Sequence, residues 1–141
     1  MQTPEFAVRV VSCAGDGPGW SAPRRIEVRE VVLVRRGMFR VRSDGIGQTV
    51  DPTLGYLLIP GRDHRVAHHA GGDVCTVIAV GEGLWREVAG ETSIASHVPV
   101  DGRLELAHRL LLRSADDPGE RAEHLVRALG LVARVPAGPG R

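Results

Sequence analysis

The sequence predicts a mainly β fold, an antiparallel barrel or sandwich over residues 1–100, followed by a hairpin of two helices. Up to Pro99, short runs rich in Val and Ile alternate with Gly, Pro and Asp, which is typical of short strands joined by turns. After Pro99, apolar residues recur every three to four positions, as on one face of a helix. The 141 residues are enough for one domain that folds without a metal or a disulfide.

The expected strands are short apolar runs. They comprise residues 6–11, 26–34, 38–41, 56–59, 65–68, 74–80 and, with a weaker pattern, 94–98. The Arg-Arg-Gly gap at 35–37 predicts a hairpin, because glycine readily takes positive φ. Residues 44–45 (Asp-Gly) predict the next turn, and residues 69–73 (His-Ala-Gly-Gly-Asp) a polar turn between strands.

The two expected helices are about ten and fifteen residues long. The first is expected to bury Leu104, Ala107, His108 and Leu111. The second begins with Asp117 as N-cap, Pro118 at the first helical position and Glu120 as in a capping box. Its apolar side comprises Ala122, Leu125, Val126, Leu129 and Val132. The hairpin either covers an open face of the β domain or forms a dimer interface.

Composition excludes several classes of function. With 18 basic and 17 acidic side chains there is no global field to hold DNA or an acidic membrane. No apolar run approaches the roughly 20 residues needed to span a bilayer, and the N-terminus lacks a signal-peptide pattern. We therefore expect a cytoplasmic protein without membrane contact. Every basic residue is arginine, which excludes a Schiff-base lysine.

The two cysteines, Cys13 and Cys75, are far apart in the sequence and form no CxxC pair. Two such cysteines make neither a thiolate zinc site nor a disulfide framework. We interpret them as small buried apolar residues in a reducing compartment.

The densest motif is GYLLIPGRDHRVAH at residues 55–68. A short apolar strand runs into a Pro-Gly turn, and His64 opens the next strand, with His64, Val66 and His68 alternating onto one face. This run resembles the second motif of the cupin superfamily. Glu30, followed seven residues later by Gly37, is similar to the end of the first cupin motif. The resemblance implies a cupin-like antiparallel β-barrel, also called a double-stranded β-helix.

The histidine pair of the first cupin motif is absent, because residues 23–26 are Pro-Arg-Arg-Ile. Of the metal ligands that the resemblance implies, Glu30 and His64 stand at the expected positions. Either His68 or His69 is the candidate for a third ligand. A divalent site in this family needs about four imidazole or carboxylate ligands. We therefore expect no native metal and no cofactor.

Two longer segments, residues 29–45 and 50–80, resemble the N-terminal effector-binding domain of AraC-type transcriptional regulators. In that family a cupin-like barrel precedes a helical hairpin, a linker and two helix-turn-helix units. The matching parts here are a barrel with an N-terminal arm at 1–100, a hairpin for dimerisation at 101–135 and a linker-like tail at 136–141. The resemblance covers roughly residues 20–135.

The family's DNA-reading module has no counterpart in this sequence. Residues 71–141 carry 10 acidic side chains against 8 arginines, whereas a major-groove reader is basic. We expect that this chain does not bind DNA by itself.

The resemblance implies a small-molecule effector inside the barrel and a homodimer formed through the C-terminal helices. Glu30, His64 and His68 are expected to point inward, with Tyr56 near the rim. The expected ligand-binding residues are Trp20, Arg24, Glu30, Tyr56, His64 and His68. Trp20 is placed as a lid over the mouth. Arg24 pairs either with a carboxylate on the ligand or with Glu30 itself.

The alternative is a small stand-alone cupin enzyme. It would be a metal-free isomerase or epimerase using His64 with Tyr56 or Asp63, or a metal-dependent oxygenase. A third possibility is a dimerisation module whose barrel is packed solid. The order of parts favours the sensor domain, so no catalytic residue is assigned.

Overall fold

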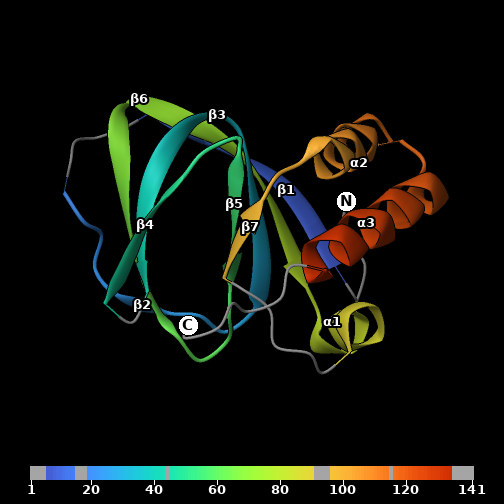
Figure 1. Cartoon of the computed structure of the whole chain (residues 1–141), viewed down its shortest axis with the longest axis horizontal. Helices are drawn as coiled ribbons and strands as arrows, with labels where there is room; N and C mark the ends of the chain where they lie inside the picture. The colour runs from blue at the N-terminus through green and yellow to red at the C-terminus, as the bar shows by residue number, and fades with distance from the viewer. Residues whose placement is uncertain (1–5, 15–18, 44, 91–95, 115, 135–141) are drawn as a thin grey trace.

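The computed structural model describes residues 6–14, 19–43, 45–90, 96–114 and 116–134, which form a curved β layer and a helical layer beside one end of it (Figure 1). The strands are β1 (Phe6–Cys13), β2 (Arg24–Arg25), β3 (Arg29–Ser43), β4 (Ile46–Val50), β5 (Leu54–Leu58), β6 (Asp63–Val80) and β7 (His97–Pro99). The helices are α1 (Glu82–Ala89), α2 (Gly102–Arg113) and α3 (Pro118–Ala133).

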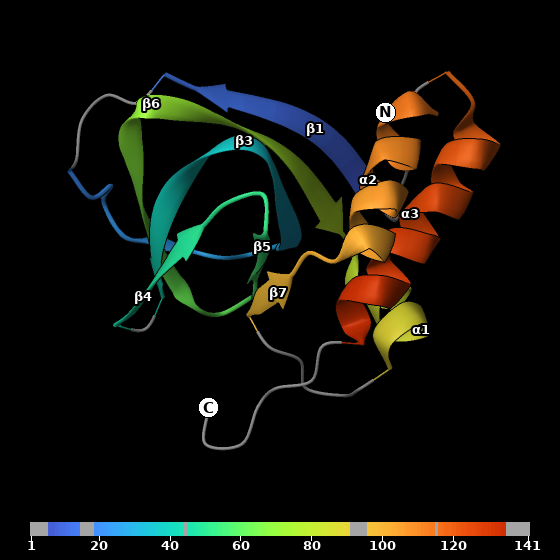
Figure 2. The ribbon, with the colours of Figure 1, turned by 45° about the horizontal axis from the view of Figure 1, so that its top comes forward.

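All the described strands belong to one antiparallel sheet. Its order is β1-β6-β3-β5-β7, with β2 beside β6 and β4 beside β3. The long strands β3 and β6 bend, so the sheet curls around its inner face without the hydrogen-bonded path closing into a full ring among the described residues (Figure 2). The predicted antiparallel β fold followed by helices is confirmed.

The predicted hairpin at residues 35–37 is wrong, because this segment lies inside the 15-residue strand β3. The pairing with β6 continues on both sides, and its register shifts between Val34 and Arg36. Gly37 has the expected positive φ of 82°, but it serves a β-bulge. A bulge and a tight turn both favour a left-handed glycine, so the glycine alone does not distinguish them.

The predicted polar turn at residues 69–73 is also wrong, because β6 continues through it. Gly37 pairs with Asp73, and Phe39 pairs with His68, so residues 69–72 of β6 lie opposite a single residue of β3. In an unbroken strand, residues five apart point to opposite faces. The wide bulge instead sets His68 and Asp73 side by side.

The other predicted turns lie where strands end. Gly45, with a φ of 82°, lies between β3 and β4, whereas Asp44 is outside the described residues. Gly61, with a φ of 91°, lies between β5 and β6, as the Pro-Gly motif predicts. The weak run at 94–98 is represented by β7, and residues 94 and 95 are not described.

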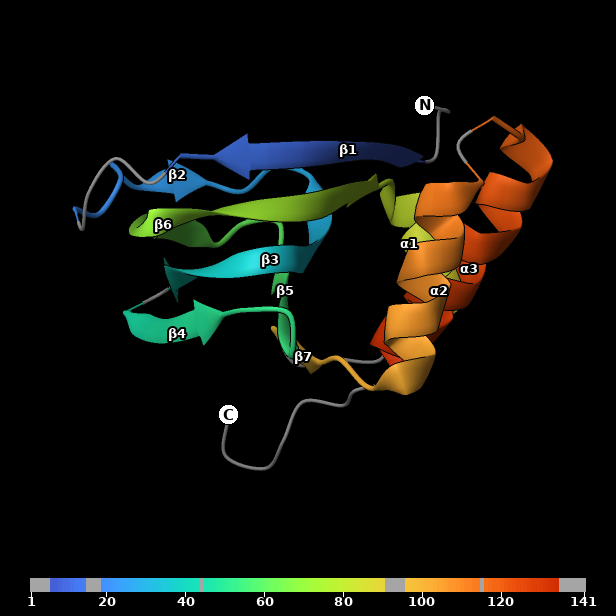
Figure 3. The same ribbon diagram turned by 90° about the horizontal axis from the view of Figure 1, so that it is seen from above.

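The helices α2 and α3 pack beside the sheet (Figure 3). The buried residues of α2 are the four expected from the sequence, Leu104, Ala107, His108 and Leu111. In α3, the expected Leu125, Leu129 and Val132 are buried together with Arg121 and Ala128. Val126 was expected on the same side, but it is 46% exposed.

The short helix α1 was not predicted. Its Trp85 is buried in the core that joins the sheet to the helices, and the Arg29 guanidinium lies 5.0 Å from the Trp85 ring centre. Strand β3 is buried on both faces, with Val31 and Leu33 toward the helices and Val32 toward the inner face of the sheet. Among the described residues, no helix combines the length and the apolar character needed to cross a membrane.

Candidate ligand-binding cavity

An open cavity of about 200 Å³ lies on the inner face of the curved sheet. Its walls are mainly apolar, and a few polar side chains converge on it, which is the usual composition of a small-molecule site. The apolar lining comprises Val11, Val32, Phe39, Val41, Leu58, Val66 and Val77. The polar lining comprises Arg9, Cys13, Arg24, Glu30, Tyr56, His64, His68, Asp73 and Cys75.

The first polar group lies at the rim of the cavity. Glu30 of β3 is nearly buried, and its carboxylate lies 3.1 Å from a guanidinium nitrogen of Arg9 and 4.0 Å from one of Arg24. The two arginine side chains remain more than half exposed. Two guanidinium groups therefore face one carboxylate, so these three side chains together carry a net charge of +1 at the rim of the cavity.

His64 and Tyr56 form the second polar group. Both are buried, with 6.1 Å between their ring centres. Burial, followed by the charge of Arg24, lowers the pKa of His64 to about 4. Its Nδ1 atom is buried without a hydrogen-bond partner among the described residues. The imidazole is therefore neutral at pH 7 and offers a nitrogen to a ligand in the cavity.

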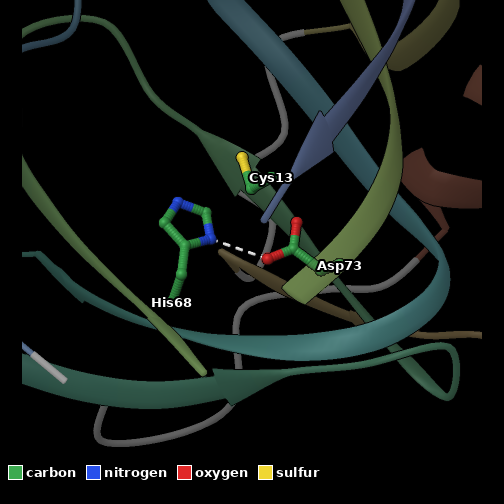
Figure 4. A group of neighbouring side chains, drawn as sticks. All are labelled: Cys13, His68 and Asp73. Carbon is green, nitrogen blue, oxygen red and sulfur yellow. Dashed lines mark hydrogen bonds and ion pairs between the residues drawn. The ribbon is translucent and has the colours of Figure 1, made fainter. Parts of the chain in front are cut away.

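The third polar group comprises Cys13, His68 and Asp73, drawn in Figure 4. The Nδ1 atom of His68 lies 2.6 Å from a carboxylate oxygen of Asp73, and the Cys75 thiol donates to the other oxygen at 3.4 Å. Burial and the neighbouring Asp73 raise the pKa of the Cys75 thiol, so it stays protonated. These residue types are the ones that bind transition metals, so this group is the part of the cavity that can hold one.

Two glycines bring the strands together at this third group. Gly37 and Gly72 both have positive φ. A Cβ atom on Gly37 would lie 2.3 Å from the Gly72 carbonyl oxygen, and one on Gly72 would lie 2.4 Å from the Cys13 carbonyl oxygen. Only glycine fits such close backbone approach, so these two positions fix the bulge that carries His68 and Asp73.

The structure brings five of the six sequence-predicted ligand-binding residues into the cavity: Arg24, Glu30, Tyr56, His64 and His68. Of the two alternatives for Arg24, the structure has the contact with Glu30. Trp20 lies elsewhere. Its ring is 5.1 Å from the Arg40 guanidinium and 4.5 Å from that of Arg42, so it packs on the outer face of β3 and does not cover the cavity.

Sequence reasoning missed four polar residues of the lining: Arg9, Cys13, Asp73 and Cys75. A signal for the first two exists, because Arg9, Val11 and Cys13 alternate along β1 onto the inner face. Asp73 carried no such signal. The sequence predicts a turn at this residue, whereas its position beside His68 depends on the bulge.

No protein-family model matches this sequence, and a search of the curated proteins finds no match either. Solved structures do match. The apo form of ToxT K231A from Vibrio cholerae has a TM-score of 0.66 at 11% identity, over 91% of this chain and 54% of ToxT. ToxT with a bound unsaturated fatty acid has a TM-score of 0.58 at 10% identity, over 90% of this chain and 52% of ToxT. The chain thus spans about half the length of ToxT.

Two further matches are limited to a smaller part of the chain. The Cnp3 cupin domain of Schizosaccharomyces pombe has a TM-score of 0.51 at 10% identity, over 62% of this chain and 64% of its own. The DMSP lyase DddQ of Ruegeria pomeroyi has a TM-score of 0.50 at 14% identity, over 57% of this chain and 40% of its own. At such identities the likeness shows the fold, and the fold is that of a cupin.

Proposed function

We propose that this chain is the effector-binding and dimerising part of an AraC-type transcriptional regulator, and that its effector is a small organic monoanion. The observation that carries the proposal is the cavity, in which apolar walls lie below a rim with one positive charge in excess. Such a site suits a ligand with a carboxylate head and a short apolar body.

The extent of the match to ToxT supports the regulator class. ToxT is itself a regulator of the AraC family. The match to ToxT covers 91% of the chain, and the residues of the β layer make up a smaller share than that. The matched part therefore includes helices as well as strands. The matches to the Cnp3 cupin domain and to DddQ cover 62% and 57% of the chain. The order of a cupin sheet followed by packed helices is therefore shared with the regulator.

The ligand chemistry also has support. One of the matched ToxT structures contains an unsaturated fatty acid, which joins a carboxylate to an apolar chain. The cavity here, at about 200 Å³, is smaller than the roughly 300–1,000 Å³ typical of drug-sized ligands. We expect a monocarboxylate with a shorter apolar body.

Strand β1 provides a route from ligand to helices. Arg9 points to the cavity rim, whereas Phe6 and Val8 of the same strand belong to the core that the helices share. A ligand carboxylate competing with Glu30 for Arg9 would favour one position of β1. It would thereby favour one arrangement of the helical layer, which is a population shift between two states.

Calorimetric titration of the purified chain with straight-chain monocarboxylates of increasing length tests the ligand. We expect binding that Arg9→Gln and Arg24→Gln each weaken by about tenfold, since each removes one charge-assisted hydrogen bond. Arg65→Gln is the matched control, because Arg65 is an exposed arginine on the outer face of β6. Equal affinity in all three variants would rule out the rim as the anion site.

We propose that the partner in the dimer is a second copy of this chain, bound through the helices. Leu106 of α2 and Val126 of α3 are 57% and 46% exposed, and both line a groove between the helices. Sedimentation equilibrium should give a dimer that Leu106→Glu converts to a monomer with an unchanged circular dichroism spectrum. A monomeric parent chain would refute this part of the proposal.

The DMSP lyase DddQ shares the fold, so the fold alone does not separate a sensor from an enzyme. Analysis of the ligand recovered after prolonged incubation with the chain distinguishes them. A sensor returns the monocarboxylate unchanged, whereas conversion to a product that His64→Gln abolishes would establish the enzyme alternative.

A further inference from the structure

We propose that Cys13, His68 and Asp73 form a site for a zinc-class divalent metal ion, distinct from the pair Glu30 and His64 that stands in register with the cupin motifs. One ligand atom from each residue lies within 4.8 Å of the others (Figure 4). Donors bound to one zinc ion lie about 3–4 Å apart, so His68 Nδ1 and the Asp73 oxygen, now 2.6 Å apart, must separate slightly, and any longer donor separation, at most 4.8 Å, must close by about 1 Å. The inference does not depend on the identity of the effector.

The backbone holds these three side chains together. Cys13 and Asp73 are direct partners in the pairing of β1 with β6. His68 joins them because residues 69–72 bulge out of β6, which places it next to Asp73 on the same face. The close backbone approaches at Gly37 and Gly72 fix this arrangement. The ligands therefore come from paired strands, and flexible loops are not needed to assemble them.

The donor set determines the class of metal. A thiolate, an imidazole and a carboxylate together favour Zn²⁺ over Mg²⁺ or Ca²⁺, which prefer oxygen ligands alone. With Cys13 as thiolate and His68 neutral, the two negative ligands balance the charge of Zn²⁺. A neutral site is the arrangement that costs least to bury.

Asp73 supplies the second argument for a cation. Its side chain is 2% exposed, and its side-chain partners in the described part of the chain are His68 and the Cys75 thiol. A thiol is a weak donor, so the Asp73 oxygen that it contacts keeps the capacity to bind a cation. Cys13 is only partly buried, which leaves a path for the ion to enter.

The test is equilibrium dialysis of the chelator-treated, tag-free chain against Zn²⁺, with metal analysis of the retained protein. We expect one zinc ion per chain. Cys13→Ser, His68→Gln and Asp73→Asn should each weaken binding by about tenfold or more, because each removes one ligand. The matched control is His64→Gln, a buried histidine on the same strand and face, which should bind zinc within about twofold of the parent chain.

A second readout uses Co²⁺ in place of Zn²⁺. Thiolate ligation gives cobalt an intense near-ultraviolet charge-transfer band, which Cys13→Ser should abolish and His64→Gln should retain. Circular dichroism of each variant verifies folding, and the nearly isosteric Cys13→Ser carries the test if Asp73→Asn does not fold. The proposal is overturned if the parent chain retains no zinc, or if His64→Gln loses the metal while His68→Gln keeps it.

Discussion

His64 couples the inner face of the sheet to pH. Its pKa is about 4 in the folded chain and near 6.5 in an unfolded one, so between these values the unfolded chain binds more protons. The stabilising contribution of neutral His64 is therefore complete above pH 6.5 and is lost as the pH falls toward 4. We expect the free energy of unfolding to drop by roughly 3 kcal/mol over this window.

Urea denaturation at pH 7 and pH 4.5, on the parent chain and on His64→Gln, measures this contribution. The variant should lose less stability between the two pH values than the parent does. A residual slope is expected in the variant, because burial also lowers the pKa of His108, whose ring contacts Thr76 at 2.7 Å. Identical slopes would show that His64 is not buried as a neutral imidazole.

Gly37 and Gly45 provide a matched pair, since both have a φ of 82°. An alanine at Gly45 meets no atom within 4 Å, so it costs only the strain of the left-handed conformation, about 1 kcal/mol. An alanine at Gly37 would in addition lie 2.3 Å from the Gly72 carbonyl oxygen. We expect Gly37→Ala to lower the free energy of unfolding by at least about 2 kcal/mol more than Gly45→Ala does, measured by urea denaturation. Equal losses would contradict the close approach.

The alternation of side chains between the two faces of a strand determines which residues of the cavity lining can be predicted from the sequence. The shared face of His64 and His68 follows from counting along a strand within a short window, and the inner position of Glu30 is what the cupin resemblance implies. Asp73 lies five residues after His68, and the same counting assigns it to the opposite face. Its true position depends on pairing with β3 and β1, which no local pattern of residues encodes.

At the scale of elements, α3 shows how a helix start can be read from sequence. The Asp117 carboxylate accepts hydrogen bonds from the backbone N–H groups of Gly119 and Glu120 at 3.0 and 3.1 Å, and Pro118 occupies the first turn. We expect Asp117→Ala to destabilise the chain by about 1 kcal/mol, as measured by thermal or urea denaturation. Asp116→Ala, one residue earlier and exposed, is the control and should have little effect.

The strands were harder to predict than the helices for a physical reason. Helix signals are local, because caps and apolar periodicity lie within a few turns of one another. The sequence predicts a break in the strand within residues 26–41 and another within residues 65–80, because glycines and polar residues lie there. Bulges contain the same residue types as turns, so these residues predict either one. Long-range pairing between β3 and β6 continues through both breaks and turns each into a bulge.

At the scale of the whole molecule, the helices complete the fold of the sheet. The core beside the helices includes residues of β1, β3, β5 and β6 together with Trp85 and the buried faces of α2 and α3. The sequence left open whether the hairpin covers the sheet or forms a dimer interface, and the structure shows that it covers the sheet. That outcome does not exclude the proposed dimer, since Leu106 and Val126 remain exposed on the other side.

This shared core predicts that strands and helices unfold together. Leu125 of α3 is fully buried within it, so Leu125→Ala should cost about 2–5 kcal/mol, whereas Ile46→Ala, 74% exposed and outside the proposed dimer groove, should cost under about 1 kcal/mol. Trp85 reports on the shared core, and Trp20 reports on the outer face of β3.

In single-tryptophan versions of the chain, the urea transitions of Trp20 and Trp85 should coincide and move together in Leu125→Ala. The two transitions should coincide because β3 contains both the residues that pack under the helices and the arginines that contact Trp20. A Trp20 transition that keeps its midpoint while that of Trp85 shifts would mean that the helical layer unfolds separately. A ligand signal then could not pass from the cavity to the helices through this core, and the route proposed along β1 would fail with it.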